Sequence, residues 1–179
     1  MLNGLMEMRK LKKMGKILII ISIVILLFCV VGAYAKDNDI ESINWNVTEG
    51  LTKTSGNSIC VTYEAGDFKF RIFTRDNDDD LAKYKKGFEK DNETGMYYRF
   101  DVDAVKMEHS NSVGGSSDAL YGEYVKMGDK KYWVEAHQSS VSVGDKNDVV
   151  NDLGNPNLSK LKGYLTYFNE HNDVTIIDV

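Results

Sequence analysis

The sequence predicts an α+β domain: an antiparallel sheet of about six to seven strands on which two amphipathic helices pack. Apolar and polar residues alternate over several stretches of about eight residues, as in half-buried strands. Short turns that contain glycine join neighbouring stretches, which favours antiparallel pairing. Two other stretches carry apolar residues at spacings of three and four, typical of a helix face. The predicted order is β-β-β-α-β-β-β-α-β, in a single domain over residues 43–179.

The first half of this domain is predicted to begin with three strands. Residues 43–47 form a first short strand, and residues 50–57 form a turn because glycine, serine and asparagine cluster there. Residues 58–65 and 68–75 alternate with period two around a short turn that contains glycine, so they predict a β-hairpin.

Residues 80–90 are predicted to be the first helix, because three apolar side chains fall at positions i, i+3 and i+7. A long strand follows over residues 95–107, with a bulge near Ala104 where the alternation changes phase. Residues 110–117 are rich in serine and glycine and are predicted to be a flexible loop. The apolar side chains of the helix are Leu81, Tyr84 and Phe88.

A second hairpin is predicted over residues 119–127 and 130–138, since Gly128-Asp129 suits a tight turn. A helical turn at 147–153 and a second helix come next, the helix being capped by Asn155 with Pro156 in its first turn. The chain closes with a mostly buried strand over residues 174–179. The apolar stripe of the second helix is Leu158, Leu161, Leu165 and Phe168.

The N-terminal segment predicts export. Residues 1–16 carry five basic residues and one acidic residue, residues 17–32 are uncharged, and residues 33–35 form an A-x-A motif. The apolar run is longer than the usual signal core of about 7–15 residues but shorter than the about 20 of a membrane helix. We therefore expect residues 1–35 to be either a cleaved signal peptide or an anchor at 17–35. Both place the remaining chain outside the cell or on its surface.

The exported part is acidic. Residues 36–42 are predicted to be a short polar linker. The chain from residue 36 onward has 17 basic and 26 acidic residues, a net charge of −9. This charge repels nucleic acid and anionic lipid, so we expect no nucleic-acid partner and membrane contact through the N-terminal segment alone. Cys60 is the one cysteine of this part, which excludes a disulfide within it, and we expect Cys60 to be a small buried residue.

The acidic run at residues 76–80 (DNDDD) has the composition of a metal loop. In an EF-hand register that starts at Asp76, Leu81 and Gly87 occupy the positions where calcium loops need glycine and glutamate. Asparagine and aspartate also cap helix N-termini and complement the helix dipole. We therefore interpret this run as the start of the helix and predict no metal site and no cofactor.

Histidines and carboxylates leave an enzymatic alternative open. His109, His137 and His171 lack the spacing of a zinc motif, but a site can be assembled in space from residues far apart in the chain. Asp101 and Asp103 share one face of a strand. A hydrolase-like site around these carboxylates with His109 or His137 is therefore the alternative to a non-catalytic role.

Aromatic residues supply the candidate binding site. They lie opposite the plainest apolar face of each predicted strand. If helices cover both faces of the sheet, these residues are core; if one face is open, they form an exposed patch that marks a binding surface. The candidate binding residues are Tyr97, Tyr124 and Trp133, with Phe73 beside them.

The order of elements resembles the Mog1/PsbP-like fold. The resemblance rests on the hairpin SICVTYEAGDFKFRIF, the helix DLAKYKKGFEK, the strands MYYRFDVDAV and ALYGEYVKMGDKKYWVEAH, and the helix LSKLKGYLTYF. It covers about residues 43–170, and the closing strand VTIIDV has no counterpart in it. The chain also resembles small exported prokaryotic proteins of unknown function, particularly archaeal ones. These resemblances imply a non-catalytic binding or assembly role.

We therefore expect an exported surface or secreted domain that binds a protein or a small ligand without catalysis. The alternatives are the hydrolase-like enzyme described above and a cation-dependent adhesion module.

Overall fold

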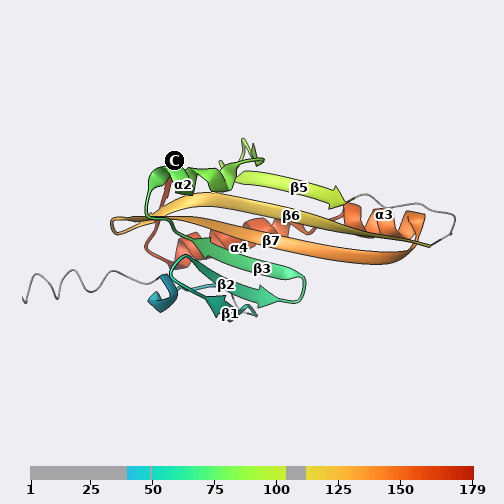
Figure 1. Cartoon of the computed structure of the whole chain (residues 1–179), viewed down its shortest axis with the longest axis horizontal. Helices are drawn as coiled ribbons and strands as arrows, with labels where there is room; N and C mark the ends of the chain where they lie inside the picture. The colour runs from blue at the N-terminus through green and yellow to red at the C-terminus, as the bar shows by residue number, and fades with distance from the viewer. Residues whose placement is uncertain (1–39, 49, 104–111) are drawn as a thin grey trace, which may run out of the picture. The chain divides into compact units, whose positions relative to one another are not determined.

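The computed structural model describes residues 40–48, 50–103 and 112–179 (Figure 1). These residues belong to one compact unit, Asp39–Val179. The predicted signal or anchor at 1–35, most of the predicted linker, the bulge near Ala104 and His109 lie outside the described residues. Within the described ranges, the helices are too short or too polar to span a membrane.

The sheet is antiparallel throughout its pairings and confirms the predicted α+β class. Seven strands follow the order β1-β2-β3-β7-β6-β5-β4, and β8 pairs with β6 outside this path. The strands are β1 (Thr52–Gly56), β2 (Cys60–Ala65), β3 (Phe68–Phe73), β4 (Glu89–Lys90), β5 (Tyr97–Asp103), β6 (Ser112–Met127), β7 (Lys130–Asp145) and β8 (Thr175–Ile177).

The helices are short except for the last one. The chain forms the 3₁₀-helix η1 (Ile40–Ser42), α2 (Asp78–Leu81), the 3₁₀-helix η2 (Ala82–Lys85), α3 (Lys146–Gly154) and α4 (Leu158–His171). In Figure 1, α4 lies behind the sheet, so the opposite face of the sheet is turned toward the reader.

Strands β6 and β7 form the predicted second hairpin, and they are much longer than predicted. Gly128 adopts φ +59°, which suits its place in the connecting turn. Pairing continues from Met127↔Lys130 to Ser112↔Asp145. The prediction of a flexible loop over 110–117 is therefore wrong for residues 112–117, because their backbone groups pair with β7 and, in part, with β5.

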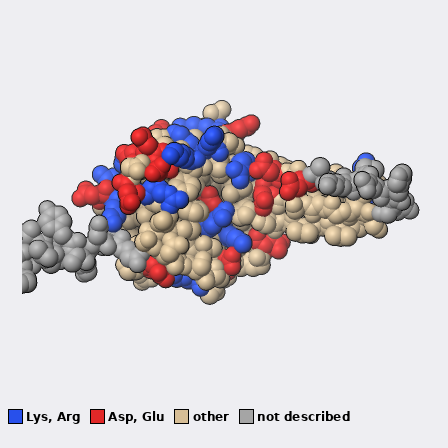
Figure 2. Space-filling model, in the orientation of Figure 1, with Lys and Arg blue, Asp and Glu red and all other residues tan. Residues whose placement is uncertain are grey.

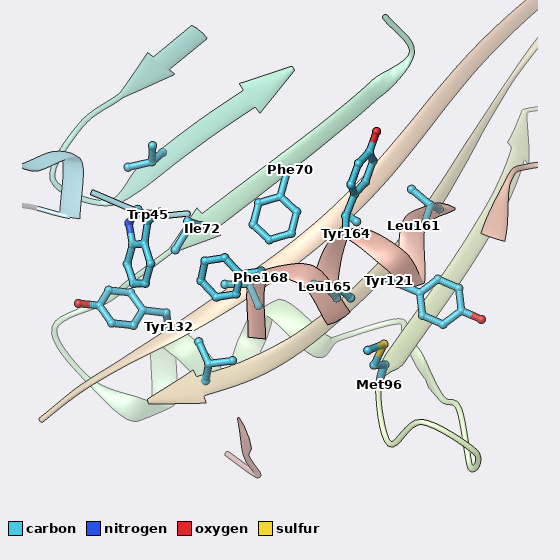
Figure 3. Packing of buried hydrophobic residues seen from close by; sticks show 14 of the residues in the cluster. Trp45, Phe70, Ile72, Met96, Tyr121, Tyr132, Leu161, Tyr164, Leu165 and Phe168 are labelled. Carbon is cyan, nitrogen blue, oxygen red and sulfur yellow. The ribbon is translucent and has the colours of Figure 1, made fainter. Parts of the chain in front are cut away.

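The face of the sheet behind the strands in Figure 1 carries the main hydrophobic core. Helix α4 packs its predicted apolar stripe here: Leu161, Leu165 and Phe168 are fully buried and Leu158 is partly buried. Figure 3 shows Phe168 between Trp45, Phe70 and Tyr132, with ring centroids 5.3 Å from both Trp45 and Phe70. The predicted cap at Asn155 is wrong: Asn157 caps α4, its side chain accepting a hydrogen bond from the Lys160 backbone N–H.

The opposite face carries a second, smaller core beneath α2 and η2. Leu81, Tyr84 and Phe88 pack on Tyr124 and Trp133, as the shared helix face predicts. The helix is shorter than the predicted 80–90, since η2 ends at residue 85, residue 87 is a glycine with φ +85°, and residues 89–90 form β4.

The packing corrects three predictions near the ends of the domain. Residues 43–47 form no strand, because Asn46 exchanges hydrogen bonds with Asn172 just beyond α4 and donates to the His171 carbonyl. The predicted turn at 50–57 contains the exposed edge strand β1 instead. The closing strand does form, but it is not buried, with Ile176 59% exposed.

Candidate functional site at a gap in the sheet edge

Strands β5 and β8 line up along the same edge of β6 and leave a gap between them. The pairing with β5 ends at Tyr97↔Gly122, and the pairing with β8 begins at Ile177↔Tyr124. Glu123 is the residue of β6 between these two pairings. A hollow of about 200 Å³ lies here. Its lining consists of Lys90, Gly95, Tyr97, Glu123, Tyr124, Ile176, Ile177 and Asp178.

Glu123 brings a buried carboxyl group to this hollow. The residue is 3% exposed and lies on the side of the sheet where α4 packs. Its Oε1 accepts a hydrogen bond from Asn169 Nδ2 of α4, at 2.5 Å. Burial raises the pKa of Glu123 to about 7, and the Asn169 hydrogen bond opposes this only in part. A carboxyl group with this pKa exchanges its proton near neutral pH.

Asn169 adds an unsatisfied polar atom next to Glu123. Its Oδ1 is buried and has no hydrogen-bond partner among the described residues. Buried polar atoms normally have partners, because an unpaired one costs about 1–3 kcal/mol. The Glu123–Asn169 pair therefore costs folding free energy that a pair of apolar side chains at the same positions would not cost.

Tyr124 and Tyr97 form the aromatic wall of the hollow. The Tyr124 hydroxyl donates to the Leu81 carbonyl at 3.1 Å and accepts from the Lys85 N–H at 3.2 Å, which fixes the ring. Tyr97 packs edge-on against Tyr124 with centroids 6.1 Å apart. The two rings are thus held in fixed positions.

Of the two alternatives for the aromatic residues, core or exposed patch, the structure shows core. Tyr124 and Trp133 are both 0% exposed, and Tyr97 is partly buried beside them. Since α2 and η2 cover this part of the sheet, the core alternative holds for these side chains. Their predicted binding role stays a prediction, and Tyr97 and Tyr124 are the two that the structure places at the hollow.

Charged groups form the rim of the hollow. Lys90 Nζ lies 3.4 Å from Asp178 Oδ1, and the Tyr97 hydroxyl donates to the same oxygen at 3.4 Å. The Lys90 ammonium also lies 5.7 Å from the centroid of the Tyr97 ring. With Glu123 ionised, the lining carries one positive and two negative charges.

A second polar cluster surrounds His137 on the face of the sheet opposite α4. His137 Nε2 lies 2.8 Å from Asp118 Oδ1 and 3.0 Å from Ser139 Oγ, while Arg71 Nη2 lies 3.4 Å from Nδ1. Because arginine only donates, Nδ1 is the acceptor and Nε2 carries the proton. Burial lowers the pKa of His137. Figure 2 shows acidic and basic side chains mixed over the middle of this face.

This cluster does not have the geometry of a nucleophilic triad. A triad needs the acid on one imidazole nitrogen and the hydroxyl on the other, so that the free nitrogen can take the hydroxyl proton. Here Asp118 and Ser139 both contact Nε2, and Arg71 occupies the side of Nδ1. The imidazole is held as a structural link between strands.

Among the other residues of the enzymatic alternative, Asp101 and Asp103 contact partners other than His137, and His109 lies outside the described residues. Asp101 pairs with Arg99 at 2.8 Å, and Asp103 accepts from Ser116 at 3.4 Å, both on exposed parts of β5. His171 stacks on Tyr167 at the end of α4. In the described parts of the chain, no three metal-ligating side chains come together.

The acidic run and Cys60 have structural explanations. Asn77 caps α2 by accepting from the Asp80 N–H at 2.8 Å, as the capping interpretation predicts. Asp78 pairs with Lys131 at 2.5 Å. Cys60 is half-buried rather than fully buried, and its burial raises the pKa of the thiol, which keeps it protonated at neutral pH.

Sequence reasoning missed Glu123 and Asn169. The signal for Glu123 was present: it interrupts the apolar side of β6 between Tyr121 and Val125, where alternation predicts an apolar residue. The location of Asn169 opposite it depends on how α4 docks, which one sequence does not reveal.

Comparison with protein-family models, with curated proteins and with solved structures finds no match for this chain. The resemblance to Mog1/PsbP-like domains therefore stays a prediction.

Proposed function

We propose that this protein is an exported, non-catalytic binding domain that takes a small ligand in the hollow between β5 and β8. The observation that carries the proposal is the buried carboxyl group of Glu123 in the lining of that hollow. A buried ionisable group with a strongly shifted pKa in a concave site is a candidate functional group.

The walls of the hollow support binding rather than catalysis. Tyr97 and Ile177 offer apolar and aromatic contact area, and the fully buried Tyr124 supports Tyr97 from below, whereas Glu123 offers one polar anchor. Among the described residues of the lining, no serine, threonine or cysteine side chain is hydrogen-bonded to a general base. The acidic charge of the exported part suits a dispersed extracellular domain.

The proposal is tested by screening a fragment library against the ¹⁵N-labelled full chain by NMR. We expect hits whose chemical-shift changes map to residues 95–97, 123–124 and 176–178. Tyr97→Leu should abolish these hits because it removes one wall of the hollow. Tyr98→Leu is the matched control, since the next residue of the same strand points to the other face and does not line the hollow.

Hits that map elsewhere, or that bind Tyr97→Leu and wild type equally, would contradict the proposal. A protein partner bound through the open sheet face would appear as shifts around His137 instead.

A further inference from the structure

We infer that the ligand of the hollow carries a protonated amine, which binds against the carboxylate of Glu123 while its apolar part lies on Tyr97 and the β8 isoleucines. This inference rests on the proposed function, since it names the class of ligand for the same site. It is carried by three features of the lining: a buried carboxyl group, two tyrosine rings and a net negative charge.

The first feature is the position of the Glu123 carboxyl group. One oxygen accepts from Asn169 Nδ2, which leaves the acceptor capacity of the other oxygen for the hollow. An ammonium group has three donors and no acceptor, so it complements an acceptor-only carboxylate.

The second feature is that the aromatic wall already attracts ammonium groups. Lys85 Nζ lies 5.6 Å from the Tyr97 centroid and 5.7 Å from the Tyr124 centroid, and Lys90 Nζ lies 5.7 Å from that of Tyr97. The negative faces of aromatic rings favour cations in this way. Both lysines are held by oxygens at the C-terminal end, Lys85 by the Val179 carbonyl and Lys90 by Asp178.

The third feature is the charge balance. Glu123 and Asp178 outnumber Lys90 in the lining, so an anionic ligand would meet net repulsion. A neutral ligand would leave the ionised carboxylate uncompensated in a site of low polarity, which is costly. A cationic head group with a short apolar tail fits best.

The size of the hollow limits the ligand. Its volume of about 200 Å³ equals the volume of about seven water molecules at about 30 Å³ each. A primary amine with a chain of about four carbons falls within this limit.

Binding of the amine is expected to release a proton. Free Glu123 is mostly protonated below neutral pH, because burial raises its pKa to about 7. The bound ammonium favours the carboxylate, so the carboxyl proton passes to the solvent as the ion pair forms. The charged groups in the lining are Lys90 on β4 and Asp178 after β8, and Lys85 of η2 adds an ammonium group over the Tyr97 and Tyr124 rings. The side chain that faces Glu123 from α4, Asn169, is neutral.

The test is calorimetric titration of the full chain with n-butylammonium, n-butanol and butyrate, which share a chain and differ in charge. We expect n-butylammonium to bind with an affinity that rises about tenfold between pH 6 and pH 8, as Glu123 ionises. Titration at pH 6 in two buffers of different ionisation enthalpy should show release of nearly one proton. We expect n-butanol and butyrate to bind much more weakly.

Variants separate the carboxylate from the rest of the site. Glu123→Gln should lose most of the n-butylammonium affinity and all of its pH dependence, while its amide oxygen still accepts from Asn169. Glu170→Gln is the same change at an exposed position next to Asn169 on α4. It should leave the n-butylammonium affinity and its pH dependence unchanged. Lys90→Gln should raise the affinity for n-butylammonium, because it removes a like charge from the lining.

The inference is overturned if n-butanol binds as tightly as n-butylammonium, if Glu123→Gln binds the amine as wild type does, or if none of the three probes binds. In each case the fragment screen decides independently whether the hollow binds another class of small ligand. Fragment hits at the hollow without amine preference would keep the proposed function and remove this inference.

Discussion

The indole ring of Trp133 occupies the space that a side chain on Gly122 would need. A Cβ atom placed on Gly122 would lie 2.0 Å from Cζ2 of the indole and 2.5 Å from Cη2. Trp133 is fully buried, and its Nε1 donates to Glu135 Oε2 at 2.7 Å, so the ring has no free direction in which to retreat. The glycine is therefore required by packing rather than by backbone conformation.

We predict that Gly122→Ala lowers the free energy of unfolding by about 3 kcal/mol or more, because overpacking forces the indole and the strand apart. Urea denaturation followed by Trp fluorescence measures this loss. Gly144→Ala is the control, since a Cβ at that position of β7 has no atom within 4 Å. It should change stability by less than about 0.5 kcal/mol. Equal effects of the two substitutions would contradict the packing argument.

The buried carboxyl group of Glu123 should make stability depend on pH. Its pKa is about 7 in the folded chain against the ordinary 4.5, so the folded state holds the extra proton between these values. Stability is therefore fully present below pH 4.5 and is lost as the pH rises through 7. Glu123→Gln should be about 3 kcal/mol more stable than wild type at pH 8.5 and similar to it at pH 4.5.

Thermal denaturation of the two proteins across this pH range checks the Glu123 prediction. A constant difference in melting temperature from pH 4.5 to 8.5 would show that Glu123 keeps its ordinary pKa. The same variant tests the amine site, so the apo protein must be measured in amine-free buffer.

Asp91 should contribute to stability in the opposite pH direction. Lys162 of α4 lies 2.7 Å from Asp91 Oδ2, and the Glu93 and Thr94 N–H groups donate to Oδ1. The Lys162 contact and these N–H groups hold the pKa of Asp91 at about 2. The contribution is therefore present above the ordinary value of 3.8 and is lost as the pH falls toward 2.

Asp91→Asn should be less stable than wild type at pH 7, and the two should converge near pH 2. Acid denaturation followed by circular dichroism measures the convergence. Glu93→Gln, in the same loop, should follow the wild-type curve. A difference between wild type and Asp91→Asn that persists at pH 2 would mean that the carboxylate charge is not what ties this loop to α4.

The ion pair between Arg71 and Glu135 lies deep in the sheet face. The Arg71 Nη2 and Glu135 Oε1 atoms are 2.5 Å apart, and the side chain of Glu135 is 7% exposed. Arg71→Met should destabilise the protein by about 3–5 kcal/mol, because it leaves a buried carboxylate without its cation. The double variant Arg71→Met/Glu135→Gln should recover much of this loss. A double-mutant cycle in urea measures the coupling free energy between Arg71 and Glu135. Strictly additive losses of stability in the two single variants and the double variant would refute this prediction.

Local patterns predicted the parts of the fold that depend on neighbours in sequence. The hairpin of β2 and β3 was predicted from alternation around Gly66, and the α4 stripe from Leu161 to Phe168 was predicted from spacing. Both signals act over a few residues, where side-chain direction follows directly from the repeat of strand or helix.

The incorrect predictions share a different cause. Residues 112–117 have the composition of a loop, but partners on both sides extend them into β6. Asn46 lies in a segment with strand-like composition, yet its backbone is satisfied by Asn172, 126 positions away. The candidate site also depends on tertiary packing. The hollow at Glu123 exists because β5, β8 and α4 pack around this residue. Tertiary contacts override local propensity at these positions.

The arrangement of β6 has a consequence for the order of folding. Its hairpin with β7 closes locally around Gly128, whereas β3 must find β7 across about 65 residues and β8 must find β6 across about 50. Contacts between residues far apart in sequence slow folding because the entropy of loop closure is lost before they form. We therefore expect the β6–β7 hairpin to act as the nucleus, with folding in milliseconds to seconds. The carboxyl group of Glu123 would then stay in water until the last strand docks, and its proton uptake would report the final step.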